Sequence, residues 1–398
     1  MGCDKRYGLR EVWVAPEASP NSPATYTQDN YLQHCTGSNF PALYRENLEN
    51  GEATGNRGQS QAFDGAQAEL AWDVTVIMPD NSTIGTPASL PESLQSLFWA
   101  AGFGSDSGPS AWTPTHGAYT MDIQANSACG RTIQLIGLDR DKRQLELLTG
   151  AVVSQITLTY SRSDICTIQF SGTAAQKYEA TAPRIPTSML GNTDFSTEAR
   201  SSFGLALPTS PAILTGVSLT LPGASSELAS ITSSSITLKA DLSSSTITAR
   251  TQSYWSIAKP STTYDVLSPD SWSVDGFGSV QSATLTMETG QAYGELTTEA
   301  QYPTELLSGQ VKVTASVTAY LIDANIGTML YDSGNPLYIY HSPGLSGHAW
   351  TMQSAKFTER PAIDLSSVDT PASGDFSLQG GETQNQITNN ALDVLYLS

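Results

Sequence analysis

The chain has 398 residues and a formal net charge of −19, from 38 acidic and 19 basic side chains. A surface of that sign repels nucleic acid and anionic membranes, which argues against a high-affinity DNA-binding protein. Charged residues make up only 14% of the chain, and its many Ser, Thr, Gly and Ala residues favour β-structure with tight turns over helical bundles. The length predicts two domains, each with its own core.

The first part of the chain predicts little regular structure. Residues 1–40 contain several prolines and few periodic apolar positions, so we expect an extended arm with short strands. Residues 44–65 are polar and contain four glycines, which makes them a long loop, and long loops inside compact domains are usually functional or disordered. A strand is predicted over 68–78.

One segment, residues 89–101, carries a strong helix signal. Ser89 and Glu92 have the spacing of a capping box, and Gly102 stands where a helix would end. Apolar residues recur at steps of three and four and form one stripe, made of Leu90, Leu94, Leu97, Phe98 and Ala101. The pattern predicts a single amphipathic helix whose apolar face packs on a sheet.

Strands follow the helix in quick succession. In the first half they are predicted over 118–125, 131–138, 150–160 and 165–172, with the charged residues 139–148 as a short connection. Residues 178–202 are rich in Pro, Ser and Thr and are the best linker candidate. We therefore expect a first domain over 1–182, a linker over 183–204 and a second β domain over 205–398.

The second half repeats a phrase of the first. A Gly-opened alternating strand occurs as "LTGAVVSQITLTY" (148–160), "LTGVSLTL" (214–221) and "GSVQSATLTM" (278–287), and T-L-T stands near the end of the first and the third. Two interpretations stay open: an internal duplication on one sheet plan, or the ordinary frequency of Ser/Thr/Val alternation in β-proteins.

The sequence contains no catalytic, cofactor-binding or metal-binding constellation that we can identify. The four histidines are never three or four residues apart (His34, His116, His341 and His348). The four cysteines form no C-x-x-C pair and are expected to be free thiols (Cys3, Cys35, Cys129 and Cys166). "GLSGH" (344–348) fails the spacing of a nucleophile elbow, and "GFGSDSG" (102–108) would end a helix where a nucleotide loop must open one. We expect no enzyme.

Three further features have ordinary explanations. Asp139 and Asp141 flank Arg140, a mixture that is more typical of a solvated turn than of a cation site. The tryptophans are dispersed, and packing explains them better than a sugar-binding platform does (Trp72, Trp99, Trp112, Trp255, Trp272 and Trp350). We expect no secretory signal in residues 1–19 and no membrane span, so the triplet at Asn81 carries no weight as a glycosylation site.

The order of parts resembles one known family. It runs from an arm through a long Gly-rich loop, a strand, one amphipathic helix ending in "AAGF" and "WTPTHGAYTMDI" (112–123) to "GAVVSQITLTYSRSDICTIQFSGTAAQKY" (150–178). Over about residues 30–180 this layout resembles the tail tube proteins of long-tailed bacteriophages. The motif L-x-G, strand, turn, strand, F-x-G is met by Leu148, Gly150, Phe170 and Gly172.

The resemblance implies a structural virion protein without catalytic, metal or cofactor site. Its expected fold is mainly β, with two tandem tail-tube-like β-sandwich domains, one packed helix, and sheets that join between subunits into a central β-barrel. Its implied partners are copies of itself in stacked rings, together with tape measure, terminator and distal tail proteins, and double-stranded DNA in transit through an acidic lumen. The chain is about twice as long as the compact family pattern, so trimeric rings are expected over hexameric ones. The implied location is the virion tail, assembled in the bacterial cytoplasm.

Two other classes of function stay open on the sequence alone. One is a phage or surface adhesin, a β-sandwich module that binds carbohydrate. The other is a polysaccharide depolymerase, for which the sequence offers no paired-carboxylate motif.

Overall fold

A computed structural model gives the structure of the chain. It describes residues 11–41, 45–49, 62–67, 70–80, 90–103, 119–120, 131–139, 144–181, 195–200, 228–231, 236–238, 250–255, 257–277, 279–294, 306–308, 311–320, 337–341, 349–352, 355–358, 362–364, 373–380 and 395–397. Within these ranges the chain is mainly β, as the composition predicts, and has one α-helix.

The first half contributes ten strands, one 3-10 helix and the α-helix to the described structure. They are β1 (Glu11–Pro16), η1 (Gln28–Asn30), β2 (Cys35–Asn39), β3 (Arg45–Glu49), β4 (Ala62–Gln67), β5 (Leu70–Ile77), α2 (Glu92–Ala100), β6 (Tyr119–Thr120), β7 (Ile133–Asp139), β8 (Gln144–Ser161), β9 (Thr167–Ala174) and β10 (Gln176–Thr181).

The remaining described strands belong to the expected linker and the second half. They are β11 (Phe195–Arg200), β12 (Leu228–Ile231), β13 (Ile236–Leu238), β14 (Arg250–Trp255), β15 (Ser273–Val274), β16 (Val280–Glu288), β17 (Gln291–Tyr293), β18 (Leu306–Ser308), β19 (Lys312–Tyr320), β20 (Leu337–Tyr340), β21 (Ala349–Met352), β22 (Lys356–Phe357), β23 (Ala362–Asp364), β24 (Ser373–Gln379) and β25 (Leu395–Leu397). Most of the expected linker, 183–204, lies outside the described residues.

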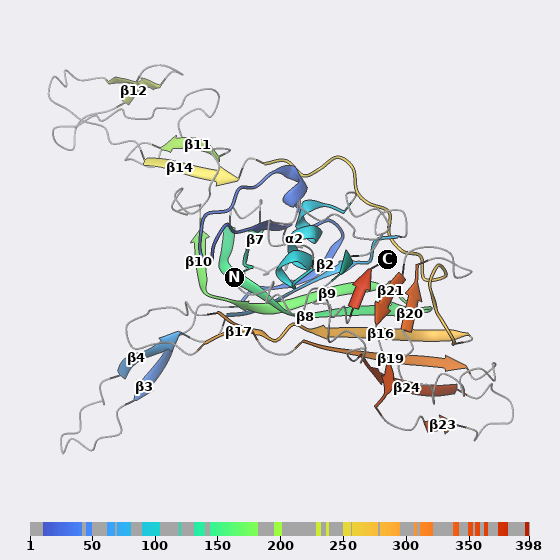
Figure 1. Cartoon of the computed structure of the whole chain (residues 1–398). Coiled ribbons are helices and arrows are strands. Elements are labelled where there is room, and N and C mark those ends of the chain that lie inside the picture. Colours follow the sequence, from blue (N-terminus) through green and yellow to red (C-terminus); the bar gives the residue numbers. More distant parts are fainter. Residues whose placement is uncertain are drawn as a thin grey trace, which may run out of the picture.

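One large antiparallel sheet organises the molecule (Figure 1). Its strands follow one another in the order β2-β5-β9-β8-β16-β19-β24-β22, and β23 pairs with β24 beside β22. The pairing of β8 with β16 joins the two halves of the chain in this sheet. The large sheet is therefore continuous across the boundary expected between the two halves.

Each half supplies four strands to this path, and the two sets have the same topology. In chain order the first set is β2, β5, β8 and β9, and the second is β16, β19, β22 and β24. In space both sets follow the order first, second, fourth, third. The strand order of the first half is thus repeated in the second.

The long strand β8 belongs to two layers. Its first residues pair with β7 and β10, and its later residues pair with β9 and β16. Gly150 lies between these parts at a φ of 60°, a conformation that glycine adopts without strain. The predicted connection over 139–148 is wrong in extent, because β7 ends at Asp139 and β8 already begins at Gln144.

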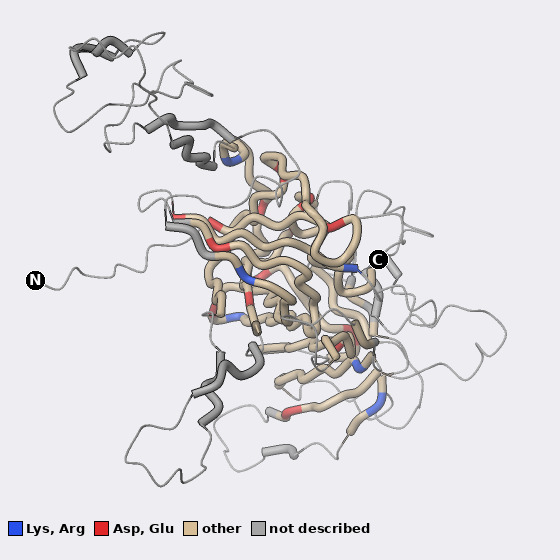
Figure 2. The backbone as a smooth tube through the Cα atoms, turned by 90° about the vertical axis from the view of Figure 1, so that its left-hand side faces the viewer, with Lys and Arg blue, Asp and Glu red and all other residues tan. Residues whose placement is uncertain are grey.

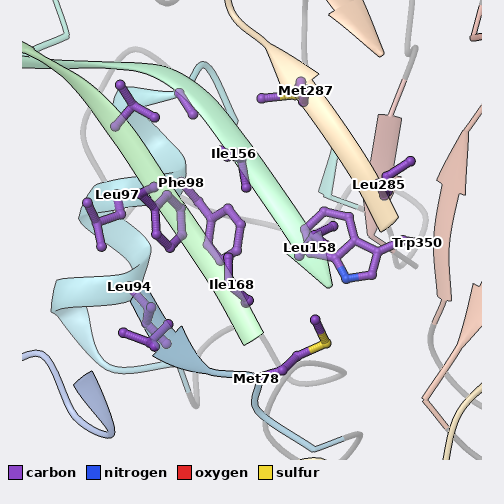
Figure 3. Packing of buried hydrophobic residues seen from close by; sticks show 14 of the residues in the cluster. Met78, Leu94, Leu97, Phe98, Ile156, Leu158, Ile168, Leu285, Met287 and Trp350 are labelled. Carbon is purple, nitrogen blue, oxygen red and sulfur yellow. The ribbon is translucent and has the colours of Figure 1, made fainter. Parts of the chain in front are cut away.

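Helix α2 covers the apolar face of the large sheet, as its stripe predicts (Figure 3). Leu94, Leu97 and Phe98 are buried, which confirms the predicted face. The Phe98 ring meets Phe170 of β9 edge-on at 5.1 Å between centroids. Trp350 of β21 lies on the other side, with its ring centroid 5.7 Å from that of Phe98. The helix therefore shares one core with strands from both halves.

The start of α2 differs from the prediction and its end agrees. The N-cap residue is Pro91 and makes no side-chain cap hydrogen bond, so the predicted capping box is wrong. Gly102, at a φ of 106°, follows the helix, and the N–H groups of Gly102 and Phe103 donate to the carbonyls of Trp99 and Phe98. This pair of hydrogen bonds is a Schellman motif. The apolar contact that usually accompanies the motif is made here by Phe98 and Phe103, whose ring centroids are 5.6 Å apart.

The N-terminal segment is partly a core element rather than an arm. Val12, Trp13, Val14 and Ala15 of β1 are fully buried, because β1 pairs with β7 and packs against α2. Four consecutive buried residues show no alternation, which is why periodicity did not identify this strand.

The described structure is mainly β with one α-helix, as the sequence predicts. Among the described residues no sheet closes into a barrel within one chain. The five-stranded sheet β15-β20-β21-β25-β6 mixes second-half strands with β6 of the first half.

Candidate assembly surface

The large sheet has one apolar face and one polar face. Along its strands, buried residues alternate with half-buried or exposed ones, as in the pattern BeBiBiBi of β5. The apolar face lies against α2 and the core (Figure 3). The polar face remains accessible within the described structure, and we call it the polar wall.

The strand registers align the side chains of the polar wall into rows that cross six strands. The first row is Thr75, Gln169, Thr157, Thr286, Thr314 and Gln379. The second row is Ile77, Thr167, Thr159, Thr284, Ser316 and Ser377. None of these twelve side chains is buried and none carries a formal charge.

Four charged residues of the wall lie above or below these rows, and Lys356 continues the first row onto β22. The acids on the wall are Asp73, Glu288 and Asp375, and the bases are Lys312 and Lys356. Glu288 and Lys312 are register partners, and Asp375 accepts a hydrogen bond from the Thr318 hydroxyl at 2.8 Å. Figure 2 shows that basic and acidic positions are sparse along the described backbone. The wall is thus hydroxyl-rich and close to neutral, with a slight excess of acid among its described residues.

Threonine suits this position for two reasons. Its branched Cβ favours extended backbone, so a strand forms without needing an apolar side chain on both faces. Its hydroxyl can form hydrogen bonds with water on the outer face. The T-L-T phrases illustrate this: Thr157-Leu158-Thr159 pairs with Thr286-Leu285-Thr284, with leucines on the core side and threonines on the wall.

Two strand edges end the sheet. On one side β2 is the terminal strand and pairs with β5. On the other side β22 and β23 lie along the same edge of β24, paired with its last and first residues respectively. Terminal strands present backbone groups that another chain can pair with.

The expected long loop contains a hairpin. β3 pairs with β4 in antiparallel register, with Leu48 opposite Phe63, and residues 50–61 between them lie outside the described part. In Figure 1 this hairpin extends away from the sheets. It lies between Asn39 and Leu70, which places its base at the end of the sheet near Gly150.

Of the four motif residues, Leu148 and Gly150 lie on β8 and Phe170 and Gly172 on β9. Leu148 and Phe170 are buried in the core. A Cβ on Gly172 would lie 1.8 Å from the carbonyl oxygen of Val152, so only glycine fits there. The motif therefore records a left-handed backbone conformation at Gly150 and a close approach of two backbones at Gly172, where β8 passes between the layers.

A buried carboxylate fixes the bend at Gly150. One oxygen of Glu17 accepts from the Gly150 N–H at 2.9 Å, and the other accepts from the Thr132 hydroxyl at 2.6 Å and the Asn21 N–H at 3.0 Å. Burial raises the pKa of Glu17 from 4.5 to about 7, although its hydrogen bonds act in the opposite direction. Sequence reasoning missed Glu17, because nothing in "APEAS" distinguishes it from a surface acid.

The histidines and cysteines within the described part have structural surroundings. His34 lies 3.0 Å from the Tyr264 carbonyl oxygen, and His341 lies 2.7 Å from the buried Tyr160 hydroxyl. Cys35 and Cys166 are free thiols. Within the described ranges no group of three or more His, Cys, Asp or Glu side chains is arranged to hold a metal ion. His116, His348, Cys3, Cys129, Asn81 and Asp141 lie outside those ranges.

The tryptophans whose side chains are described pack in the interior. Trp72, Trp99, Trp272 and Trp350 are all buried, as the packing interpretation predicts. Trp112 lies outside the described residues, and the side chain of Trp255 is not described. The described tryptophans therefore form no exposed sugar-binding platform.

None of the helices described in the structure has the length and apolar character needed to span a membrane. Comparison with protein-family models gave no match, and comparison with curated proteins gave none either.

Proposed function

We propose that this protein is the repeating subunit of a bacteriophage tail tube, a structural virion protein that forms stacked homo-oligomeric rings. The polar wall is the observation that carries the proposal. In a ring it would face the channel, while α2 and the core would lie on the outer side.

A channel for DNA needs an inner surface to which phosphates do not adhere. Each phosphate contact made by Lys or Arg adds affinity, and several together bind tightly at moderate salt. The polar wall supports passage because its two central rows carry no formal charge over six strands. Around them, with Lys356 at the β22 end of the first row, the described wall has three acids against two bases. A surface needed only for solubility would not require charge to be sparse on one face.

The repeated strand order supports trimeric rings with pseudo-sixfold symmetry. A shift by four strands carries β2, β5, β9 and β8 onto β16, β19, β24 and β22. Because neighbouring strands alternate in direction, this shift preserves strand direction, as rotation about a ring axis must. β8 and β16 are antiparallel, whereas strands at equivalent positions of a ring run in the same direction. The T-L-T sequence that they share therefore reflects the polar wall to which both strands contribute.

The same shift identifies the junction between neighbouring copies. In the shifted arrangement β22 takes the position of β8, and β2 of the next copy takes the position of β16. The edge strands β22 and β23 of one copy would therefore pair with β2 of the next copy. The β8–β16 pair inside each chain is the internal example of that junction. Such pairing would use both terminal strands and close the large sheets into one barrel.

The proposal places the protein in the virion tail, with tape measure, terminator and distal tail proteins as further partners and duplex DNA in transit. Electron microscopy of the purified chain tests it: rings or tubes with a central channel are expected, and a protein that stays monomeric under all conditions contradicts it. Native mass measurement of single rings is expected to give three chains. Six chains per ring would contradict the pseudo-sixfold arrangement and leave the second half as a decoration domain.

A further inference from the structure

The large sheet contains the same local irregularity twice, at the start of each of its two sets of four strands. His34 precedes β2 and Ser279 precedes β16, and both have a positive φ, of 51° and 44°. The His34 carbonyl accepts from the Ile77 N–H of β5 at 3.0 Å. The Ser279 carbonyl accepts from the Tyr320 N–H of β19 at 3.3 Å. A left-handed conformation is uncommon for residues other than glycine, so its recurrence with the same hydrogen bond aligns the two sets residue by residue.

A β-bulge follows the left-handed residue in both sets. In β2 the register against β5 shifts between Cys35 and Gly37. In β16 the register against β19 shifts between Val280 and Ser282. A bulge inserts one extra residue into one strand of a pair, and each of these bulges begins one residue after the left-handed residue. The two bulges therefore give the same alignment as the two hydrogen bonds.

The alignment continues into the next strand and agrees with the sequence. It places Val74 of β5 on Val317 of β19. Their partners on the next strand are two buried phenylalanines, Phe170 of β9 and Phe376 of β24, and a serine follows each. From the two valines onward the halves read "VTVIMPDNSTIGT" and "VTAYLIDANIGT", which share V-T, an aspartate and I-G-T. This agreement favours an internal duplication over the ordinary frequency of alternating Ser, Thr and Val.

The aligned positions are staggered along the sheet. The row that contains Thr75 reaches Thr314 four strands later, whereas the residue aligned with Thr75 is Thr318. The aligned unit therefore advances by four residues over four strands, or one residue per strand. With about 3.3 Å per residue and about 4.8 Å between strands, this stagger is a strand tilt of about 35°, which is typical of closed barrels. A sheet with this stagger continues into further copies of the same unit, so a second copy of this chain fits its edges.

The strand β8, which ends the first set, corresponds to two strands in the second set. β22 pairs with β24 after the aligned phenylalanine, and β23 pairs with β24 before it. Thr159 of β8 pairs with Thr167, three residues before the phenylalanine of β9. Asp364 of β23 pairs with Ser373, three residues before the phenylalanine of β24. Asp364 therefore stands at the position of Thr159.

The junction inside the chain gives the register of the junction between copies. Thr159 pairs with Thr284, which stands four residues after the first residue of the β16 bulge. Asn39 stands at the same distance from the first residue of the β2 bulge. Among the described strands β2 and β23 each pair with one neighbour only, so each has an edge open to a further strand. We propose that β23 of one copy pairs antiparallel with β2 of the next copy, with Asp364 opposite Asn39. The proposal deepens the proposed function and rests on it, because it specifies the contact between subunits of one ring.

Disulfide trapping in the full chain tests this register. Within one chain Asn39 and Asp364 lie on opposite edges of the large sheet with six strands between them, so a disulfide that joins these positions links two copies. Directly opposite residues of antiparallel strands have Cβ atoms about 4.5–5.5 Å apart, and diagonal neighbours are about 7–8 Å apart. Asn39→Cys with Asp364→Cys should therefore give covalent dimers and trimers on mild oxidation, read on a non-reducing gel.

The matched control moves one cysteine by two residues along β23. Asn39→Cys with Ala362→Cys should link at least five-fold less than the pair with Asp364→Cys. Each single-cysteine variant should give no more linked chain than the wild type, which accounts for the native thiols. Melting temperatures under reducing conditions check that both double variants fold.

The outcomes separate this inference from the proposed function, with electron microscopy reporting rings. Rings together with preferential linking through Asp364→Cys support both. If rings form and the Ala362→Cys pair links equally well or better, or neither pair links, the register is wrong and the tube proposal stands. If no rings form but the Asp364→Cys pair still links preferentially, the edge pairing holds and the tube proposal fails. Neither rings nor preferential linking overturns both.

Discussion

The carboxylate of Glu17 accepts a hydrogen bond from the backbone N–H of Gly150 at 2.9 Å, at the point where β8 leaves one layer and enters the next. This contact joins the end of β1 to the strand that links the two halves of the chain. It also makes stability depend on pH.

The pH dependence has a definite sign. Burial raises the pKa of Glu17 from 4.5 to about 7, so the folded protein holds this proton more tightly than the unfolded chain does. The free energy of unfolding should therefore fall as pH rises from about 4.5 to about 7, by an amount of about 3 kcal/mol, and level off above that. Urea unfolding of the wild type and of Glu17→Gln across this range measures the effect. The variant should lack this contribution, and parallel pH profiles would contradict the prediction.

Phe98→Ala should lower the free energy of unfolding by about 3–5 kcal/mol, because it removes a buried ring from a close-packed core. Phe98 contacts Phe103, Phe170 and Trp350, so the variant should loosen α2 and the second-half strand β21 together. Chemical denaturation provides the measurement. Leu307→Ala, at a side chain that is 50% exposed, is the control and should change stability by less than about 0.5 kcal/mol. An unchanged melting temperature in Phe98→Ala would show that this ring is not buried.

Gly172→Ala should be strongly destabilising, by about 2–3 kcal/mol or more, because the new methyl group would overlap the Val152 carbonyl and force β8 and β9 apart. Gly37→Ala is the matched control in the same sheet. Its new methyl would have Thr75 Cβ as its nearest atom at 3.8 Å, an ordinary contact, so a change of less than about 1 kcal/mol is expected. Equal melting temperatures for the two variants would refute the close approach at Gly172.

The proposed channel predicts how DNA affinity responds to charge. Assembled wild-type protein should not bind duplex DNA measurably at physiological salt. Thr157→Lys with Thr286→Lys places two cations side by side in the first row of the polar wall. Tubes of this variant should retain duplex DNA in a strongly salt-dependent way, because each ring repeats the phosphate contacts.

The control for this experiment adds the same charge elsewhere. Ser261→Lys with Thr263→Lys changes two exposed positions outside the sheet and should leave retention of DNA near the wild-type level. Equal retention by both variants would place the polar wall outside the channel. A wall that bound duplex DNA without added lysines would contradict the proposed passage.

The hairpin region gives the last prediction. Deleting residues 47–60 should leave a folded protein that no longer polymerises, because the β3–β4 hairpin extends from the sheet end that would face the next ring. Circular dichroism checks the fold and electron microscopy the assembly. Normal tubes from the deleted chain would show that rings meet elsewhere.

Local sequence patterns determined the position of the helix, the mainly β fold class and the residue types of the polar wall. The apolar stripe of α2 identified the buried face because a helix places residues three and four apart on one side. Alternation in β5, β9, β16 and β19 fixed which side chains share a face, since the period of a strand is two.

The tertiary structure decided which face is covered, which strands are neighbours, and where polar groups are buried. β8 and β16 are more than one hundred residues apart, and no local pattern reports a pairing that depends on closing so long a loop. Pro91 replaced the expected cap and the charged residues at the start of β8 formed a strand, because packing overrode local preference. Glu17 became a buried acid only because Gly150, Thr132 and Asn21 converge on it. The sequence by itself determined the alternation of polar and apolar residues, whereas long-range contacts decided what that alternation builds.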